Sequence, residues 1–65
     1  MNAAMEIAEG EVYRMRRQHP CGGWEWRVTR TGADIGIECL VCARRVLLDR
    51  RKFESRVKAL VQRDA

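Results

Sequence analysis

Apolar and polar residues alternate through the middle of the chain, as they do in strands that bury one face. The two apolar rows are Trp24, Trp26 and Val28, and then Ile35, Ile37 and Cys39. Two runs of period two that are separated by a turn predict a β-hairpin. If the Thr-Gly-Ala-Asp segment 31–34 is the loop, Val28 faces Ile37 in this hairpin. By the same register Trp26 faces Cys39, so both apolar rows lie on one side of the sheet.

Shorter patterns predict three further elements. Residues 11–16 alternate in the manner of a strand, and residues 46–48 are a short apolar run typical of a fourth strand. Asp49 is a favourable helix N-cap. After it, apolar residues recur at the spacing of one helical face, which predicts a C-terminal helix over residues 50–61 that lies across the sheet. The apolar positions of that helix are Phe53, Val57, Leu60 and Val61.

The length of the chain and the composition of its first residues define the expected domain. A chain of 65 residues has room for one domain. Residues 1–9 are rich in Ala and Glu and have little to bury, so we expect a flexible leader without function. Residues 10–63 then form a small β or α+β domain. Its expected architecture is an antiparallel β-barrel or β-ribbon of about four strands with a C-terminal α-helix.

All three cysteines and the only histidine fall into two short clusters. These are His19-Pro20-Cys21 and Cys39-Leu40-Val41-Cys42. A domain this small buries only about 60% of the surface of its unfolded chain, and a structural zinc site can add on the order of 10 kcal/mol to folding. Four N and S ligands match the Cys3His set of structural zinc sites, so we expect zinc to staple the domain. The short His-x-Cys spacing leaves open whether His19 completes the site.

Other roles for the cysteines deserve comparison with the zinc hypothesis. An odd number of cysteines does not fit a closed disulfide framework and favours a reducing compartment. A Cys-x-x-Cys pair also occurs in thiol redox proteins, but the thioredoxin fold needs a strand-helix-strand unit that this chain is too short to hold. The remaining alternative is that the thiols are small buried core groups.

Basic residues are concentrated after the leader. The net charge is +4, and residues 1–11 carry three glutamates and no base, so subtracting their −3 leaves +7 on residues 12–65. A domain with this charge is suited to an anionic partner, although charge runs are also simply solvated surfaces. The candidate nucleic-acid contacts are Arg14, Arg16, Arg17, Arg27, Arg30, Arg44, Arg45, Arg50, Arg51 and Lys52.

Two features sharpen the nucleic-acid hypothesis. A helix that begins at Arg50 would add its N-terminal N–H groups to three cations and favour a phosphate there, although Asp49 competes for those groups. The tryptophans could stack on bases. We expect Trp26, in phase with Val28, to pack in the core, and Trp24 to be the more exposed of the two.

Catalysis has little support in the sequence, and we expect no enzyme activity. The single histidine is assigned to metal, no Ser/His/Asp set or carboxylate pair is indicated, and four protein ligands leave zinc no open position for water. No apolar run approaches the roughly 20 residues that span a bilayer, and the N-terminus lacks the basic-then-apolar order of a signal peptide. We therefore expect a cytoplasmic protein that has no membrane contact and no small-molecule substrate.

The ordered motifs of the chain resemble a known family. The motifs are Gly10-Glu11, Arg-x-x-His-Pro-Cys-Gly at 16–22, Trp-x-x-x-Arg-x-Gly-Ala-Asp-Ile-x-Ile-x-Cys at 26–39, Cys42, and Arg-x-Phe-Glu at 51–54. This order is similar to the bacterial domain of unknown function 951 family over residues 9–61. The resemblance implies a compact cytoplasmic bacterial domain without an assigned activity, with translation-linked partners by association. It also implies that His19, Cys21, Cys39 and Cys42 occupy the ligand positions, and that Ala43 stands where many relatives have Gly.

We therefore carry three functional hypotheses. The first is a structural-zinc module that binds RNA or single-stranded nucleic acid through its arginines. The second is an adapter that uses the same basic surface to dock on an acidic protein or on a ribosomal or polymerase assembly. The third is a thiol redox protein in which Cys39 and Cys42 cycle between thiol and disulfide. The basic surface alone does not distinguish the first two.

Overall fold

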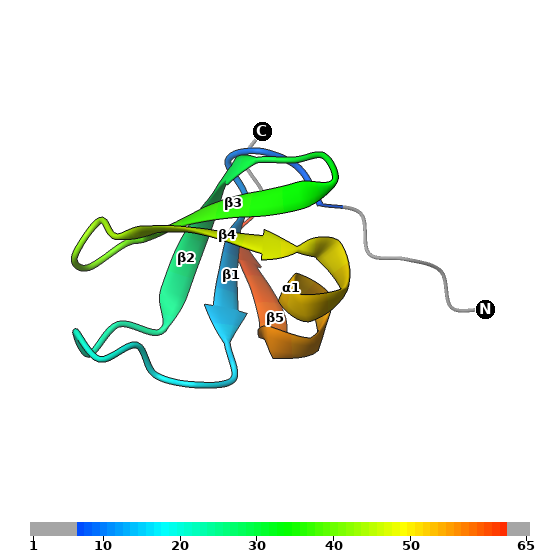
Figure 1. The fold of residues 1–65 in the computed structure, drawn as a ribbon. Coiled ribbons are helices and arrows are strands. Elements are labelled where there is room, and N and C mark those ends of the chain that lie inside the picture. Colours follow the sequence, from blue (N-terminus) through cyan, green and yellow to red (C-terminus); the bar gives the residue numbers. More distant parts are fainter. Residues whose placement is uncertain (1–6, 63–65) are drawn as a thin grey trace.

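A single antiparallel sheet with one short helix makes up the fold in the computed structural model, which describes residues 7–62 (Figure 1). The elements are β1 (Val12–Met15), β2 (Glu25–Arg30), β3 (Asp34–Cys39), β4 (Arg45–Asp49), α1 (Arg50–Arg56) and β5 (Val57–Gln62). The five strands lie in the order β4-β3-β2-β1-β5, and every neighbouring pair is antiparallel. The predicted small β fold with a C-terminal helix is confirmed. The sheet has one strand more than expected and is open rather than closed into a barrel.

The central hairpin forms in the predicted register. Val28 pairs with Ile37 and Trp26 pairs with Cys39 between β2 and β3. Toward the turn the register shifts, and Arg30 pairs with Gly36 instead of Ile35. The predicted pairing therefore holds at the end of the hairpin that carries Cys39. Near the loop, a β-bulge or similar irregularity between Val28 and Arg30 shifts the register by one residue.

The C-terminal helix begins where the sequence predicts, but it ends early. Asp49 caps it by accepting a hydrogen bond from the backbone N–H of Lys52 at 2.8 Å. Helix α1 stops at Arg56, and residues 57–62 form β5, so the predicted helix over 57–61 is wrong. Strand β5 pairs with β1, which otherwise has a partner only in β2. Satisfying the open edge of β1 outweighs continuing a helix, because unpaired strand N–H and C=O groups are costly when buried.

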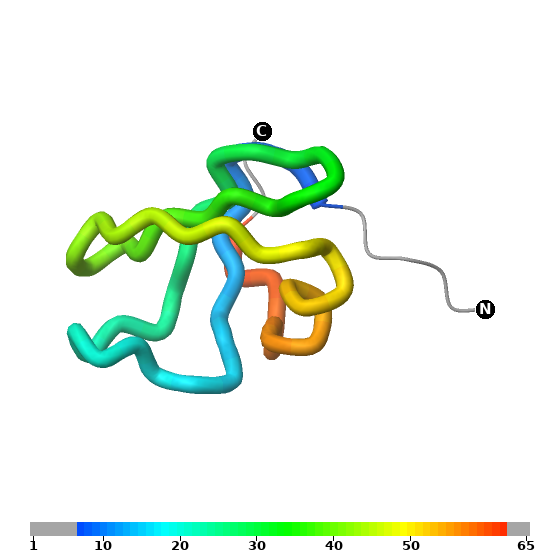
Figure 2. Tube along the Cα trace, viewed as in Figure 1, coloured from blue at the N-terminus to red at the C-terminus, as the bar shows by residue number. Residues whose placement is uncertain are grey.

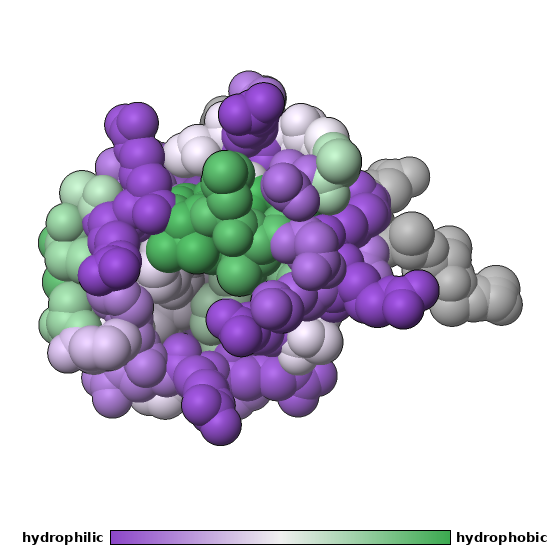
Figure 3. All heavy atoms as spheres, viewed as in Figure 1, coloured by the Kyte–Doolittle hydropathy of each residue, from purple (hydrophilic) through white to green (hydrophobic). Residues whose placement is uncertain are grey.

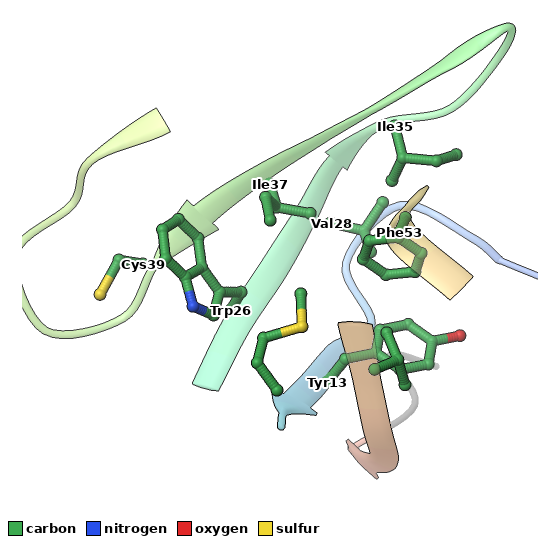
Figure 4. Packing of buried hydrophobic residues seen from close by; sticks show 9 residues of the cluster. Tyr13, Trp26, Val28, Ile35, Ile37, Cys39 and Phe53 are labelled. Atoms are coloured by element: carbon green, nitrogen blue, oxygen red, sulfur yellow. The ribbon is translucent and has the colours of Figure 1, made fainter. Parts of the chain in front are cut away.

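The core lies between the concave face of the sheet and α1 (Figure 4). Phe53 of α1 is fully buried, and its ring meets Tyr13 of β1 edge-on with centroids 5.3 Å apart. Tyr13 donates a hydrogen bond from its hydroxyl to Glu11 Oε1 at 2.7 Å, so this buried carboxyl has a partner at the rim of the core. A phenylalanine in the middle of α1 thus packs the helix against β1.

The predicted leader and domain boundaries fall partly beyond the described part of the chain. Residues 1–6 and residue 63 lie outside the described residues. Of the rest of the predicted leader, Ile7 packs against the core cluster, and Ala8 donates its backbone N–H to Glu11 Oε1 at 3.0 Å.

Candidate metal centre

Two loops at the same end of the sheet, with the last residue of β3, carry the predicted metal ligands (Figure 2). Residues 16–24 connect β1 to β2, and residues 40–44 connect β3 to β4. Both loops leave the central hairpin at one end, because β2 begins opposite the point at which β3 ends. The backbone N–H of Leu40 donates to the carbonyl of Glu25 at 3.1 Å and ties the second loop to the start of β2. Residues far apart in the sequence are thereby brought together by strand pairing.

The first loop is a tight turn built on its own backbone. His19 donates its N–H to the carbonyl of Gly23, and Gly22 donates to the carbonyl of His19, both at 2.8 Å. Gly22 has a φ of 98°, a left-handed conformation that glycine adopts without steric cost. This turn presents His19 and Cys21 on the side of the loop that faces the second cluster.

The second loop has the form of a sulfur-binding knuckle. Ala43 donates its N–H to the carbonyl of Cys39 at 2.9 Å, and Cys39 in turn donates to the carbonyl of Arg44 at 2.9 Å. Ala43 has a φ of 65°, so an alanine adopts the left-handed conformation at the position where the family resemblance implies glycine. The turn is therefore retained, with the steric cost of a Cβ in that region.

The four candidate ligand atoms converge on one point. Nδ1 of His19 lies 2.9 Å from Sγ of Cys21 and 3.7 Å from Sγ of Cys42, and the Sγ atoms of Cys21 and Cys39 are 3.5 Å apart. All four atoms lie within 4.8 Å of one another. Tetrahedral zinc with Zn–S bonds near 2.3 Å separates its sulfurs by roughly 3.8 Å. The cluster can hold one metal ion, and the short His-x-Cys spacing does not keep His19 away from the cysteines.

The electrostatic environment differs between the thiols. Burial raises the pKa of the Cys39 thiol, but hydrogen bonds from the backbone N–H groups of Cys42 and Val41, with those of the neighbouring thiols, outweigh it and leave that pKa lowered. Partial desolvation raises the pKa of the Cys21 thiol. A hydrogen bond from the backbone N–H of Gly23 lowers that pKa, but the adjacent thiols raise it again, and the net pKa is raised. Backbone donors aimed at a sulfur stabilise its thiolate, which is the form that binds metal.

Close packing joins the two loops to the core. A Cβ at Gly23 would lie 2.8 Å from Val41 Cγ2 and 3.2 Å from Cys39 Sγ, so only glycine lets the loops approach this closely. The ring of His19 meets Trp26 edge-on with centroids 5.0 Å apart. Trp26 is buried, as predicted, and Trp24 is half-buried beneath the guanidinium of Arg14, 4.8 Å from its ring centroid.

On the convex face of the sheet, the predicted arginines alternate with glutamates. Arg14 pairs across strands with Glu25. The row that crosses β2, β3 and β4 consists of Arg27, Glu38 and Arg45. A surface of alternating sign attracts a polyanion less than a purely basic one does.

The start of α1 also differs from the predicted phosphate site. Arg50 forms an ion pair with Glu54 at 3.4 Å, and Asp49 occupies the N–H of Lys52. Asp49 thus engages one of the N–H groups that a phosphate would need at this helix terminus. Arg51 and Lys52 remain on the exposed surface, as do Arg30 and Arg44.

Three arginines instead line one groove on the concave side of the sheet. Arg16 donates its backbone N–H to the carbonyl of Arg56 at 2.9 Å, which joins the end of β1 to the end of α1. Arg16, Arg17 and Arg56 line the opening of a groove of about 590 Å³, and no carboxylate is among its lining residues in the described part of the chain. Arg56 was not among the predicted contacts, because its position depends on the helix ending there.

No helix in the described residues is long and apolar enough to cross a membrane.

Comparison with known proteins places the chain in a family. The chain is 37% identical over 59 residues to the uncharacterized protein YyzM of Bacillus subtilis (strain 168). The aligned region covers 91% of this chain and 87% of the relative. No solved structure matches the chain. Residues 7–61 match the profile described as bacterial protein of unknown function (DUF951). The resemblance noted from the motifs is confirmed, and the chain belongs to the DUF951 family of bacterial proteins.

Proposed function

We propose that the protein is a non-catalytic structural-zinc module of the bacterial cytoplasm that binds single-stranded RNA through its arginines. The observation that carries this proposal is that Arg16, Arg17 and Arg56 line one opening, and that no carboxylate of the described residues is in its lining. Guanidinium groups are well suited to phosphate, since they stay charged and donate paired hydrogen bonds. A local surplus of positive charge on this scale favours the polyanion over a small substrate.

Zinc fits the donor set better than other metals. Three sulfurs and one imidazole nitrogen are the ligands of closed structural zinc sites, whereas magnesium and calcium take oxygen. The residues that would hold it are His19, Cys21, Cys39 and Cys42. With four protein ligands the ion would stabilise the fold and leave no position for a catalytic water.

Metal analysis tests the zinc assignment and separates it from the redox hypothesis. We expect one equivalent of zinc per chain in purified protein, and a large fall in the thermal midpoint when a chelator is added. Protein that lacks zinc, keeps its midpoint with chelator and cycles reversibly between thiol and disulfide would support the redox role instead.

Fluorescence anisotropy with a labelled single-stranded RNA tests the binding proposal. If three phosphates are neutralised, the slope of log affinity against log salt should be about −2, from roughly −0.7 per phosphate. Arg56→Glu should weaken binding much more than Arg27→Glu, which makes the same change of charge on the convex face. Equal losses in both variants would show that this opening is not the binding surface.

An adapter role is the alternative. The tip of the second loop exposes Val41 by 65% and Leu40 by 42%, and exposed apolar side chains are typical of protein contacts. Absence of RNA binding at low salt, together with tight binding to an acidic protein, would favour the adapter over the RNA-binding module.

A further inference from the structure

The groove between the metal centre and α1 has an apolar floor. Met15, Trp26, Ile37, Val46 and Leu48 line it from the concave face of the sheet. Val46 and Leu48 belong to this face but are only half-buried. Figure 3 shows an apolar patch where Figure 1 draws β4, with hydrophilic side chains around it. The concave face of the sheet is therefore not fully covered by the protein itself.

The short helix explains the exposed floor. Helix α1 packs Phe53 against the core and contacts β3 and β4, but it ends at Arg56. A helix that continued to Val61 would have extended over more of the concave face of the sheet. Instead the chain turns into β5 on the far side of β1, and the part of the sheet beside the metal loop stays open.

Polar groups stand along the edges of this floor. On one edge the first metal loop contributes Arg16, Arg17 and His19, and on the other the end of α1 contributes Ser55 and Arg56. The hydrogen bond from Arg16 N–H to the Arg56 carbonyl holds these two edges together at one end. An apolar surface bordered by cations matches a ligand that has a flat apolar part next to an anion.

We infer that this groove is a subsite for one unstacked nucleobase of the bound RNA, with the phosphates on either side held by Arg16, Arg17 and Arg56. The inference rests on the proposed function and names the part of the RNA that the site takes. A nucleotide combines an apolar ring face with a charged phosphate, as the floor and the edges of the groove require. The volume of about 590 Å³ lies within the roughly 300 to 1,000 Å³ of small-ligand pockets.

The nucleobase is favoured over an acidic peptide by the polar groups at the edges. The imidazole of His19 and the hydroxyl of Ser55 lie beside the apolar floor, where the edge of a flat base would need hydrogen-bonding partners. The Ser55 hydroxyl donates to the Lys52 carbonyl at 2.8 Å, so it offers the base an acceptor. An acidic peptide would place an apolar side chain on this floor, and such a side chain needs no hydrogen-bonding partner. The acidic peptide is therefore the competing occupant that the test includes.

An abasic oligonucleotide separates base binding from phosphate binding. A short oligouridylate and an abasic oligomer of the same length carry the same phosphates, so a purely electrostatic surface binds them alike. We expect the wild-type protein to prefer the oligouridylate by about fivefold or more. Equal affinity for the two oligomers would overturn the inference while leaving the RNA-binding proposal intact.

Two substitutions on β4 provide matched variants. Leu48→Glu places a carboxylate on the groove floor, and Leu47→Glu places the same charge on the opposite, exposed face of the strand. We expect Leu48→Glu to lose both affinity and the preference for the oligouridylate, and Leu47→Glu to retain the preference. The same preference in both variants would overturn the inference. Zinc content and thermal midpoint show whether each variant is folded.

A fluorescence measurement keeps the inference testable if Leu48→Glu does not fold. In Trp24→Phe, Trp26 is the remaining tryptophan, and it lines the groove. Adenosine 5′-monophosphate should change Trp26 emission, whereas ribose 5-phosphate should not. Equal responses to both compounds would overturn base binding. Displacement of the oligouridylate by oligoglutamate as effectively as by unlabelled RNA would assign the groove to an acidic peptide.

Discussion

Trp26 on β2 lies directly opposite Cys39 on β3, so a buried tryptophan is paired across the strands with a candidate metal ligand. Figure 4 shows the two side chains next to each other at one end of the core. The ring of Trp26 also meets His19, which belongs to the other loop. The hydrophobic core and the metal centre are therefore one packing unit. We therefore expect a change at the candidate ligands to alter the packing of the core.

The first prediction is that Trp26 reports metal occupancy. In Trp24→Phe, removal of the metal by a chelator should shift Trp26 emission to longer wavelength, because the loops separate and water reaches the indole. Steady-state fluorescence measures the shift, and re-addition of zinc should reverse it. In the matched variant Trp26→Phe, the remaining Trp24 should respond less. Unchanged Trp26 emission in metal-free protein would contradict the coupling.

The second prediction concerns the buried ligand. Cys39→Ser should abolish stoichiometric metal binding and leave the chain largely unfolded, because a loss on the order of 10 kcal/mol exceeds the stability of a small core. Circular dichroism and metal analysis measure the two effects. Val41→Thr, at an exposed position in the same loop, should keep both metal and fold. A folded, metal-free Cys39→Ser protein would show that the core suffices without the ion.

The third prediction uses the left-handed residue of the second loop. Ala43→Gly should raise the free energy of unfolding by about 1 kcal/mol, because glycine at a φ of 65° has no Cβ to clash with the following carbonyl. Urea denaturation in saturating zinc measures this change in the free energy of unfolding. The same replacement in regular strand geometry, Ala59→Gly on β5, should have the opposite sign, about 0.5 to 1 kcal/mol of destabilisation. Destabilisation by both would contradict a left-handed turn at Ala43.

The fourth prediction is the pH dependence of the metal site. The pKa of Cys39 is lowered in the fold, so its contribution to stability is present above the unfolded pKa and is lost as pH falls through the folded pKa. The pKa of Cys21 is raised in the fold, so in the metal-free protein its contribution to stability is present below the unfolded pKa and is lost as pH rises through the folded pKa. Metal binding needs all three cysteines as thiolates, so metal affinity should fall between about pH 8 and about pH 6. Competition with a chromophoric chelator measures it, and a constant affinity would exclude thiolate ligands.

The sequence by itself determined the parts of the protein that depend on local pattern and residue type. Period-two alternation, with residues 31–34 as the loop, predicted the pairing of Trp26 with Cys39, because that register places both apolar rows on one face. The start of α1 followed from Asp49, since an N-cap acts within a few residues. The four candidate ligands could be named from composition, as three cysteines and one histidine leave few other combinations.

Only the tertiary structure decided what lies beyond Arg56 and which arginines meet. The spacing of Val57, Leu60 and Val61 suits a helix, yet these residues form β5, because the open edge of β1 offers backbone hydrogen bonds that no local pattern reveals. That choice shortened α1, exposed part of the concave face and brought Arg56 beside Arg16. The sequence specifies which side chains are present, whereas the pairing of distant backbone segments determines which of those side chains come together.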